Sequence, residues 1–318
     1  MKLHRLLGFT PSKESEPIPT GFKELDQITG GLQIGEICTI GGRPGMGKTA
    51  FAVSLLRNIG VIQKVPTAYL ALDLREQQIV KRLRASLTGC PDDNPSCGQT
   101  EWVPPQDVVK TMENIGFHYR YERNHEQEVM EMMKAAPVWI EHDLGVNMDE
   151  IISRMERLHQ ENQVRLFFID SLQWIMNSTK LTEQPQELMK LRQAADRLKV
   201  AVVLTCMLGR AVETRGGNHR PMLSDLRDMG LLELYSSQVL LLYRPEYYHY
   251  EIFEDQTPAA HLADIMVEKN RFGHTGMVRM YFDKYFGFWE RDSAETQMFR
   301  QLFGDNTLPH EEERELPF

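Results

Sequence analysis

A glycine-rich loop between a strand-forming and a helix-forming stretch constrains the fold more than any other feature of the sequence. Residues 39–56, TIGGRPGMGKTAFAVSLL, fit the spacing G-x-x-x-x-G-K-[ST], with Gly42, Gly47, Lys48 and Thr49 at its fixed positions. Backbone N–H groups can wrap a diphosphate at such glycines, and the following helix points the positive end of its dipole at the anion. A chance glycine turn is the alternative, but it would not need the strand and helix patterns on either side. The loop therefore predicts a site for a nucleoside triphosphate.

The motif predicts a role in nucleotide binding for individual residues of this site. Lys48 is expected to reach the β and γ phosphates, and the Thr49 hydroxyl to bind Mg²⁺. In VRLFFIDS, apolar residues lead to Asp170 at the end of a predicted strand, where a carboxylate can hold a Mg²⁺-bound water. An aspartate at a strand end is common in α/β proteins, so Asp170 alone is weak evidence for a metal site. Together with the phosphate loop it becomes strong evidence. The residues expected to contact the nucleotide are those of the loop itself, namely Gly42, Arg43, Pro44, Gly45, Met46, Gly47, Lys48, Thr49 and Ala50.

Strand and helix patterns alternate from Ile18 onward. This alternation predicts an α/β fold with a mostly parallel sheet and helices on both faces, extended by a C-terminal antiparallel hairpin at roughly 262–290. The predicted strands are 36–41, 67–73, 137–141, 165–170, 200–206, 238–243 and 262–269. The predicted helices are 48–59, which we expect to end at Gly60, and 76–87, 124–135, 148–162 and 186–198.

Composition divides the chain into three parts. We expect an N-terminal arm over residues 1–17, one α/β domain over 18–291 and a polar, acidic tail over 292–318. A loop rich in Pro, Asp and Asn interrupts the domain at 91–105. The net charge of −9 argues against a broadly basic surface that coats DNA. It leaves room for a ring around a single strand, which needs only a few cations per subunit.

Membrane and redox signals favour a cytoplasmic protein. No apolar run reaches the length of a membrane span, and MKLHRLLGF lacks the long apolar core of a signal peptide. Cys38 and Cys206 fall in predicted core strands, whereas Cys90 and Cys97 lie in a polar loop as a weak metal candidate that lacks further ligands. We expect reduced thiols and no membrane association.

Several stretches together resemble the C-terminal motor domain of the DnaB-type replicative DNA helicases, within the RecA-like P-loop ATPases. The similar stretches are IPTGFKELDQITGGLQIGE, GGRPGMGKTAFA, RPMLSDLRDMG with LLLYRPEYY, and VEKNRFGHTG. The resemblance covers about residues 18–291, and PMLSDLRDMG is more specific to this branch than the phosphate loop. It implies a hexameric ring, ATP and Mg²⁺ bound between subunits, and single-stranded DNA in the central pore. The family's N-terminal domain, which helps to hold the ring and recruits primase, is not expected in this chain.

The resemblance also assigns roles to charged residues. It implies that Lys48 and Thr49 hold phosphate and Mg²⁺ and that Asp170 is the second acidic group of the metal site. Lys269 and Arg271 fall on positions that, in the family, reach the γ-phosphate held by a neighbouring subunit, where charge accumulates in the transition state. Without the resemblance, these two residues would be interpreted as solvated charges at a strand end.

Two positions depart from the family's pattern. In the family, a glutamate after the second core strand activates the attacking water, and YLALDLREQQ places the shorter Asp73 there. A carboxylate one methylene shorter falls outside the reach of about 2.6–3.2 Å that a general base needs, unless the strand shifts. Glu76, about one helical turn along, is the second candidate. The family's glutamine that senses γ-phosphate maps to Met207, whose thioether cannot make that hydrogen bond.

The resemblance implies that two loops, after the Asp170 strand and after the following strand, face the DNA-binding pore. The loop RAVETRGGNHRP carries Arg210, Arg215 and Arg220, with glycines that free backbone N–H groups for phosphate contact. The loop MNSTKLTEQPQE carries Lys180 alone. The alternative for either loop is that its charges are simply solvated.

The C-terminal sequence EEERELPF has two interpretations. It resembles the acidic tip of bacterial single-stranded-DNA-binding proteins, and Phe318 would then enter an apolar pocket of a replication or repair partner while the acids steer toward a basic rim. The simpler interpretation, which we favour, is a solvated tail that keeps the protein soluble.

Two functions follow from these features. The phosphate loop, Asp170, Lys269 and Arg271 favour an ATP-driven DNA helicase or translocase that acts on single-stranded DNA as a ring. Asp73, Met207 and the expected lack of the N-terminal domain favour a degenerate paralogue, an assembly or loading protein that switches with nucleotide and hydrolyses it slowly.

Overall fold

The computed structural model describes residues 16–88, 123–142, 147–176, 179–229, 232–283 and 287–290. Four predicted features fall outside these residues: the loop at 91–105, the pair Cys90 and Cys97, the acidic tail, and all but the last two residues of the arm.

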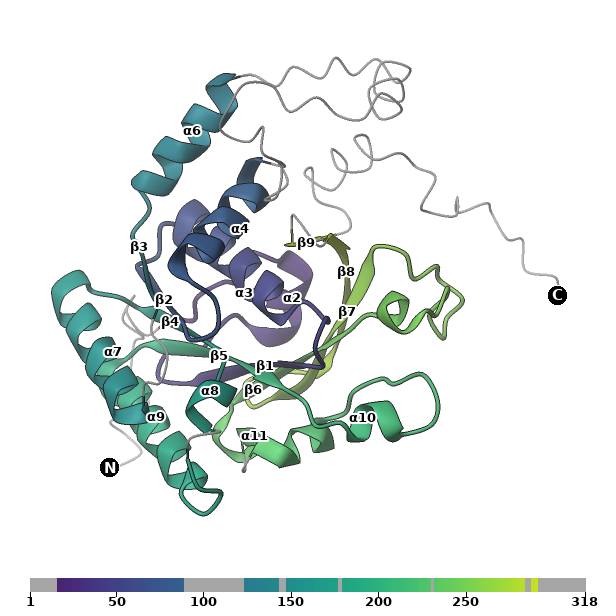
Figure 1. Cartoon of the computed structure of the whole chain (residues 1–318). Coiled ribbons are helices and arrows are strands. Elements are labelled where there is room, and N and C mark those ends of the chain that lie inside the picture. Colours follow the sequence, from purple (N-terminus) through teal and green to yellow (C-terminus); the bar gives the residue numbers. More distant parts are fainter. Residues whose placement is uncertain are drawn as a thin grey trace, which may run out of the picture.

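A nine-stranded sheet runs through the described part of the chain in the order β3-β2-β4-β5-β1-β6-β7-β8-β9. The strands from β3 to β6 in this order are parallel, and β7, β8 and β9 add to β6 as an antiparallel extension (Figure 1). The predicted fold class is therefore confirmed. The strands are β1 Ile37–Gly42, β2 Thr67–Ala71, β3 Val138–His142, β4 Leu166–Asp170, β5 Ala201–Met207, β6 Gln238–Tyr243, β7 Leu262–Asn270, β8 Gly276–Asp283 and β9 Gly287–Glu290.

Helices cover both faces of the sheet and enclose two apolar clusters. Central strands such as β4 and β6 are buried along their whole length, which explains their nearly continuous apolar sequences. On one face lie α2 Lys23–Thr29, α3 Lys48–Leu56, the π-helical turn η2 Arg57–Ile62, α4 Glu76–Thr88 and α6 Arg123–Lys134. On the other lie α7 Met148–Asn162, α8 Gln173–Met176, α9 Gln184–Leu198 and α11 Leu232–Tyr235. Shorter helices are α10 Ala211–Thr214, η3 Leu223–Met229 and η4 Pro245–Tyr248.

The prediction that the helix after the phosphate loop ends at Gly60 was wrong. The α-helical part α3 ends earlier, at Leu56, and η2 then continues past Gly60 to Ile62. A Cβ atom at Gly60 would lie 2.6 Å from Cγ2 of Val138 in β3. The glycine therefore allows η2 to pack closely against the sheet rather than ending the helix.

The parallel strands bring the predicted site residues to one edge of the sheet. The phosphate loop follows β1, Asp73 lies two residues beyond β2, Asp170 ends β4 and Met207 ends β5. In α/β sheets, ligands bind at this carboxyl edge of the strands. Among the described helices, none is long and apolar enough to cross a membrane.

Candidate nucleotide-binding and catalytic site

The phosphate loop needs glycine at two positions for both conformation and space. Gly45 and Gly47 have φ angles of +79° and +92°, which side chains other than hydrogen rarely allow. A Cβ atom at Gly45 would lie 2.1 Å from Cε2 of Tyr247, and one at Gly47 would lie 2.9 Å from Cε2 of Phe282. Since Gly47 is also the N-cap of α3, the loop delivers its backbone directly to a helix N-terminus, as an anion site requires.

Residues from the C-terminal half of the chain hold this loop from outside. Arg244 Nη1 donates to the backbone oxygen of Gly45 at 2.9 Å, and its guanidinium stacks 3.9 Å from the centroid of Phe282. The backbone N–H of Phe288 in β9 donates to Ser54 Oγ of α3 at 3.0 Å. The antiparallel extension therefore braces both the phosphate loop and the helix behind it.

Lys48 is a largely desolvated cation at the start of α3. Its Nζ donates to the backbone oxygen of Arg43 at 3.2 Å. Burial lowers the pKa of Lys48, and the nearby Asp170 carboxylate acts in the opposite direction. Phosphate oxygens would compensate this charge better than a single carbonyl does, so the position suits a polyphosphate ligand.

Asp170 is 3% exposed and is held by hydroxyl groups on both sides. Tyr69 Oη, from β2, donates to Asp170 Oδ2 at 2.6 Å, and Thr205 Oγ1, from β5, donates to Oδ1. These donors fix the carboxylate and compensate its burial. Tyr69 and Thr205 were not predicted as site residues; the sequence signal for each is a hydroxyl group inside a largely apolar strand.

The residues present fit a nucleotide with Mg²⁺. Thr49 and Asp170 supply oxygen atoms, which are the ligands that Mg²⁺ prefers, and Lys48 and the loop backbone supply donors for phosphate. The described residues contain no group of three His, Cys, Asp or Glu side chains that would hold a metal by themselves.

The two carboxylate candidates for the general base differ in their surroundings. Asp73 is exposed at the carboxyl edge of the sheet, and its charge acts on Lys48. Glu76 Oε1 instead accepts a hydrogen bond from the backbone N–H of His142 at 3.2 Å, which joins the start of α4 to the end of β3. The geometry therefore favours Asp73 over Glu76.

Met207 lies next to the phosphate loop. It is the last residue of β5, it pairs in register with Gly42, and it is 41% exposed. A thioether at this place is a weak acceptor and donates nothing. The side chain at this position therefore offers no hydrogen-bond donor beside the start of the phosphate loop.

Lys269 and Arg271 lie at the opposite edge of the sheet. Because β7 runs antiparallel to β6, its carboxyl end is level with the start of β1; Arg271 N donates to Ser237 O, and Ser237 N donates to Ile37 O. From Ile37 to Gly42, β1 spans about 17 Å at the usual rise of a strand. The two cations therefore lie far from the phosphate loop of their own chain.

Both cations contact backbone oxygens of α11 rather than carboxylates. Lys269 Nζ donates to Glu233 O at 2.6 Å and Arg271 Nη2 donates to Leu234 O at 2.7 Å. Burial, followed by the nearby Arg271 charge, lowers the pKa of Lys269. Within the part of the chain that the structure describes, neither cation forms an ion pair with a carboxylate.

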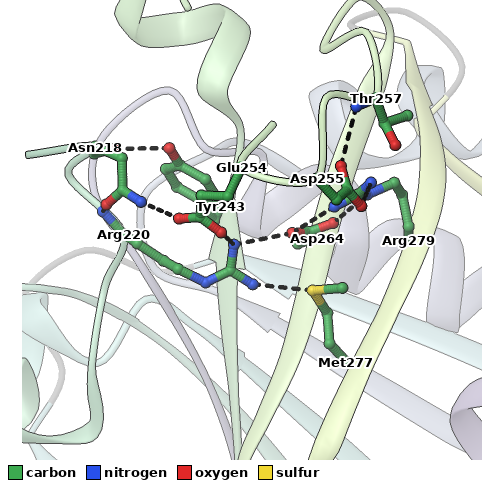
Figure 2. Close-up of polar contacts among 9 residues, drawn as sticks. All are labelled: Asn218, Arg220, Tyr243, Glu254, Asp255, Thr257, Asp264, Met277 and Arg279. Atoms are coloured by element: carbon green, nitrogen blue, oxygen red, sulfur yellow. Dashed lines mark hydrogen bonds and ion pairs between the residues drawn. The ribbon is translucent and has the colours of Figure 1, made fainter. Parts of the chain in front are cut away.

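The three arginines predicted to bind DNA differ in their contacts. Arg215 pairs with Asp225 at 2.8 Å, and Arg220 lies 3.2 Å from both Glu254 and Asp264 (Figure 2). Arg210 is exposed at the N-cap of α10, and among the described residues no side chain pairs with it. Thus Arg215 and Arg220 are engaged within the chain, and Arg210 is the one whose charge faces solvent.

Comparison with known proteins identifies the family to which a chain with this fold and phosphate loop is similar. The family model for the DnaB-like helicase C-terminal domain matches residues 17–290. The chain is 28% identical to the replicative DNA helicase DnaB of Buchnera aphidicola subsp. Baizongia pistaciae, over 89% of this chain and 56% of that protein. It is 30% identical to a probable plasmid replicative DNA helicase of Chlamydia psittaci, over 85% of this chain and 54% of that protein. The chain thus spans about half the length of the curated relatives it matches.

Solved structures give the same result for the fold. One of them, an ATPase domain, superposes with a TM-score of 0.73 at 25% identity, covering 87% of this chain and 92% of that one. A DnaB-like replicative helicase, solved in a study of its interactions with primase, gives 0.73 at 24% identity and covers 90% of this chain and 66% of that one. Its likeness concerns the fold alone. With a RecA-like sheet and a family match across nearly all of the described residues, this chain belongs to the DnaB-like helicase C-terminal domain family.

Proposed function

We propose that this chain is the ATP-hydrolysing motor of a DnaB-like DNA helicase that moves along single-stranded DNA as a ring, most simply a hexamer. We also propose residues 18–291 as the limits of the motor domain. Family membership supports the reaction class, and the phosphate loop with Lys48, Thr49 and Asp170 supports ATP and Mg²⁺ as the ligands.

The observation that carries the ring is the separation of the phosphate loop from Lys269 and Arg271. These cations lie at the edge of the sheet opposite the loop, too far to reach a nucleotide bound by their own chain. Head-to-tail packing of subunits brings one edge against the other and closes into a ring when the rotation closes. Arg271 then meets the γ-phosphate of the neighbour and stabilises the charge that develops there.

The remaining residues divide the chemistry among them. Lys48 exchanges its contact with the Arg43 carbonyl for phosphate oxygens, and Asp73 accepts a proton from the water that attacks the γ-phosphorus as ADP leaves. When bound, Mg²⁺ would neutralise phosphate charge, and Thr49 and Asp170 would hold it. The Tyr69 and Thr205 hydroxyls fix the Asp170 carboxylate.

We propose that the loop at 210–220 binds single-stranded DNA. Arg210 is exposed there and suits a phosphate contact, and the open glycines Gly216 and Gly217 leave backbone N–H groups accessible. We assign Arg215 and Arg220 to hold the loop, since both are paired internally. In the other loop, Lys180 lies 3.7 Å from Glu183.

A second function, a nucleotide-switched assembly or loading protein with slow hydrolysis, draws on Asp73 and Met207. By the family resemblance, these are the positions of the glutamate that activates water and of the glutamine that senses γ-phosphate; here Asp73 is exposed at the carboxyl edge of the sheet and Met207 pairs in register with Gly42. Such a protein would still bind ATP and assemble but would turn over slowly.

Measuring the ATPase rate with and without oligo-dT separates the two functions. A helicase motor is expected to hydrolyse ATP faster when DNA is bound, by about tenfold or more, whereas a switch protein stays slow in both conditions. Arg210→Ala should reduce the DNA stimulation. An ATPase that is slow and indifferent to DNA would support the second function.

The cellular setting and further partners are also proposals. Burial raises the pKa of the Cys38 and Cys206 thiols to about 12, so both remain protonated packing residues, as suits a reducing cytoplasm. A tail peptide ending in Leu316, Pro317 and Phe318 should bind a replication or repair partner with salt-sensitive affinity if the tail is a docking segment. A peptide without such binding would leave the tail as a solubilising segment.

A further inference from the structure

Arg43, which lies inside the phosphate loop, joins that loop to the short helix α10. Its Nε and Nη2 atoms contact the two carboxylate oxygens of Glu213 at 3.0 and 2.9 Å, and its Nη1 donates to the backbone oxygen of Leu208 at 2.7 Å. The residue is only 7% exposed. A bidentate arginine–carboxylate contact fixes orientation as well as distance, so α10 is held to the loop as one unit.

The backbone of the same residue contacts the phosphate-binding lysine. Lys48 Nζ donates to the Arg43 carbonyl at 3.2 Å. A bound phosphate competes for this ammonium group, so nucleotide binding changes the hydrogen bonding of the residue that holds α10. Arg43 therefore contacts the nucleotide-binding Lys48 through its backbone carbonyl and Glu213 of α10 through its side chain.

The far end of the loop at 210–220, which begins with α10, is fixed to the antiparallel extension. Figure 2 shows Arg220 reaching between Glu254 and the fully buried Asp264, which also binds Arg279. In the same view, Tyr243 Oη donates to the backbone oxygen of Asn218 at 2.6 Å. These contacts connect residues 218–220 to β6, β7 and β8, so this end of the loop stays with the sheet.

Two glycines lie between the two attachments. A Cβ atom at Gly216 or Gly217 would have nothing within 4 Å, and Gly217 has a φ of +99°. The Gly217 carbonyl accepts from Tyr250 Oη at 2.9 Å, and His219 Nδ1 lies 3.2 Å from the Val212 carbonyl of α10. The two glycines therefore leave room for α10 to move relative to residue 218 when these two contacts break. Arg210 lies on the α10 side of it, and its carbonyl accepts from the N–H of Glu213 at 2.9 Å.

We propose that Glu213 is a positioning residue that couples nucleotide occupancy of the phosphate loop to the placement of Arg210. The inference rests on the proposed function, because it takes Arg210 as the DNA contact. A change at Lys48 passes through Arg43 to Glu213, moves α10 with Arg210, and is absorbed at Gly216 and Gly217. By linkage, DNA bound at Arg210 changes nucleotide affinity by the same factor.

The test measures this coupling in the full chain. The dissociation constant of a fluorescent non-hydrolysable ATP analogue with Mg²⁺ is determined with and without saturating oligo-dT for the wild type, Glu213→Gln, Glu213→Asp and Glu254→Gln. We expect DNA to change the wild-type constant by about fivefold or more. Glu213→Gln and Glu213→Asp, which lose the bidentate contact, should reduce this ratio to less than about twofold.

Glu254→Gln is the matched control. This variant makes the same chemical change in a carboxylate that pairs with Arg220 of the loop at 210–220. Because Glu254 does not contact the phosphate loop, the ratio of the two dissociation constants should equal that of the wild type. Thermal unfolding confirms that each variant is folded. A wild-type ratio near one in the presence of bound DNA, or an undiminished ratio in both Glu213 variants, overturns the coupling.

A second readout needs no DNA. Amide hydrogen exchange over residues 208–215 should change when the analogue binds to the wild type and should not change in Glu213→Gln. If the wild type binds no oligo-dT, the proposed DNA function fails, and this readout still decides whether the link exists. Unchanged exchange in the wild type overturns the inference by itself.

Discussion

The two edges of the sheet, which we propose to meet as the two halves of a catalytic site between neighbouring subunits, are built differently. At the carboxyl edge, Lys48 and Asp170 are desolvated and enclosed by the phosphate loop, Tyr69 and Thr205. At the opposite edge, Lys269 and Arg271 rest on backbone oxygens of α11. In the proposed ring, the first edge binds the nucleotide, and the second supplies cations to the nucleotide that a neighbouring subunit holds. Hydrolysis then requires both edges.

Removing the cation at the binding edge should have the largest effect. Lys48→Ala is expected to lower ATP turnover by at least about 10³-fold, because the charge contributes to both binding and the transition state. The side chain faces a ligand site, so the thermal unfolding midpoint should stay close to that of the wild type. Steady-state ATPase assays and circular dichroism melts check both points, and unchanged turnover would remove the phosphate-loop assignment.

Removing the cation at the other edge should affect chemistry without affecting binding. Arg271→Ala is expected to lower turnover by about 10²–10³-fold while the affinity for an ATP analogue stays within a few-fold, since the group acts on developing charge. The matched control is Arg197→Ala, which removes an exposed arginine paired with Glu156 on the helical face. Equal losses in both variants would make Arg271 an ordinary surface charge.

Lengthening the carboxylate at Asp73 tests how water is positioned at the binding edge. Asp73→Glu is expected to raise turnover by about tenfold with little change in nucleotide affinity, because the longer side chain positions water better. Glu76→Ala is the comparison, and it should act mainly on stability, because it removes the acceptor of the His142 N–H. A fall in rate for Asp73→Glu would mean that the site is already built around aspartate.

The smallest expected effect concerns the hydroxyl that holds Asp170. Tyr69→Phe keeps the ring stacked on Phe168 and removes one donor from a buried carboxylate, which should lower the free energy of unfolding by about 1–3 kcal/mol. The Mg²⁺ concentration needed for half-maximal analogue binding should rise a few-fold. Tyr243→Phe removes a comparable buried hydroxyl that contacts Asn218 and should leave the Mg²⁺ requirement unchanged.

The sequence predicted the elements whose signals are local. The phosphate loop, the strand ending at Asp170 and the alternation of strands with helices are encoded in short windows, and all of them lie where expected. The carboxylate at position 73 could likewise be placed from the end of its strand. The shared edge of the sheet follows because parallel strands bring their carboxyl ends together.

What the sequence could not predict depends on partners far along the chain. Tyr69 and Thr205 reach Asp170 only because β2 and β5 flank β4. Arg220 was predicted to contact DNA, but folding brings two carboxylates beside it, Asp264 from β7 and Glu254 from the segment before β7, and both pair with its guanidinium. Gly60 locally predicts a helix end, yet its place is set by Val138 across the fold.

The central claim, that the two edges meet between subunits, has a direct measurement. Arg271→Ala subunits are mixed in varying ratios with Lys48→Ala subunits under conditions in which assembly and exchange are verified by light scattering, and ATPase activity is recorded. Each parent lacks one half of the site, but a mixed interface can join an intact phosphate loop on one subunit to an intact Arg271 on its neighbour. We expect activity above both parents, greatest at intermediate ratios. Mixed assemblies that never exceed either parent would contradict the claim.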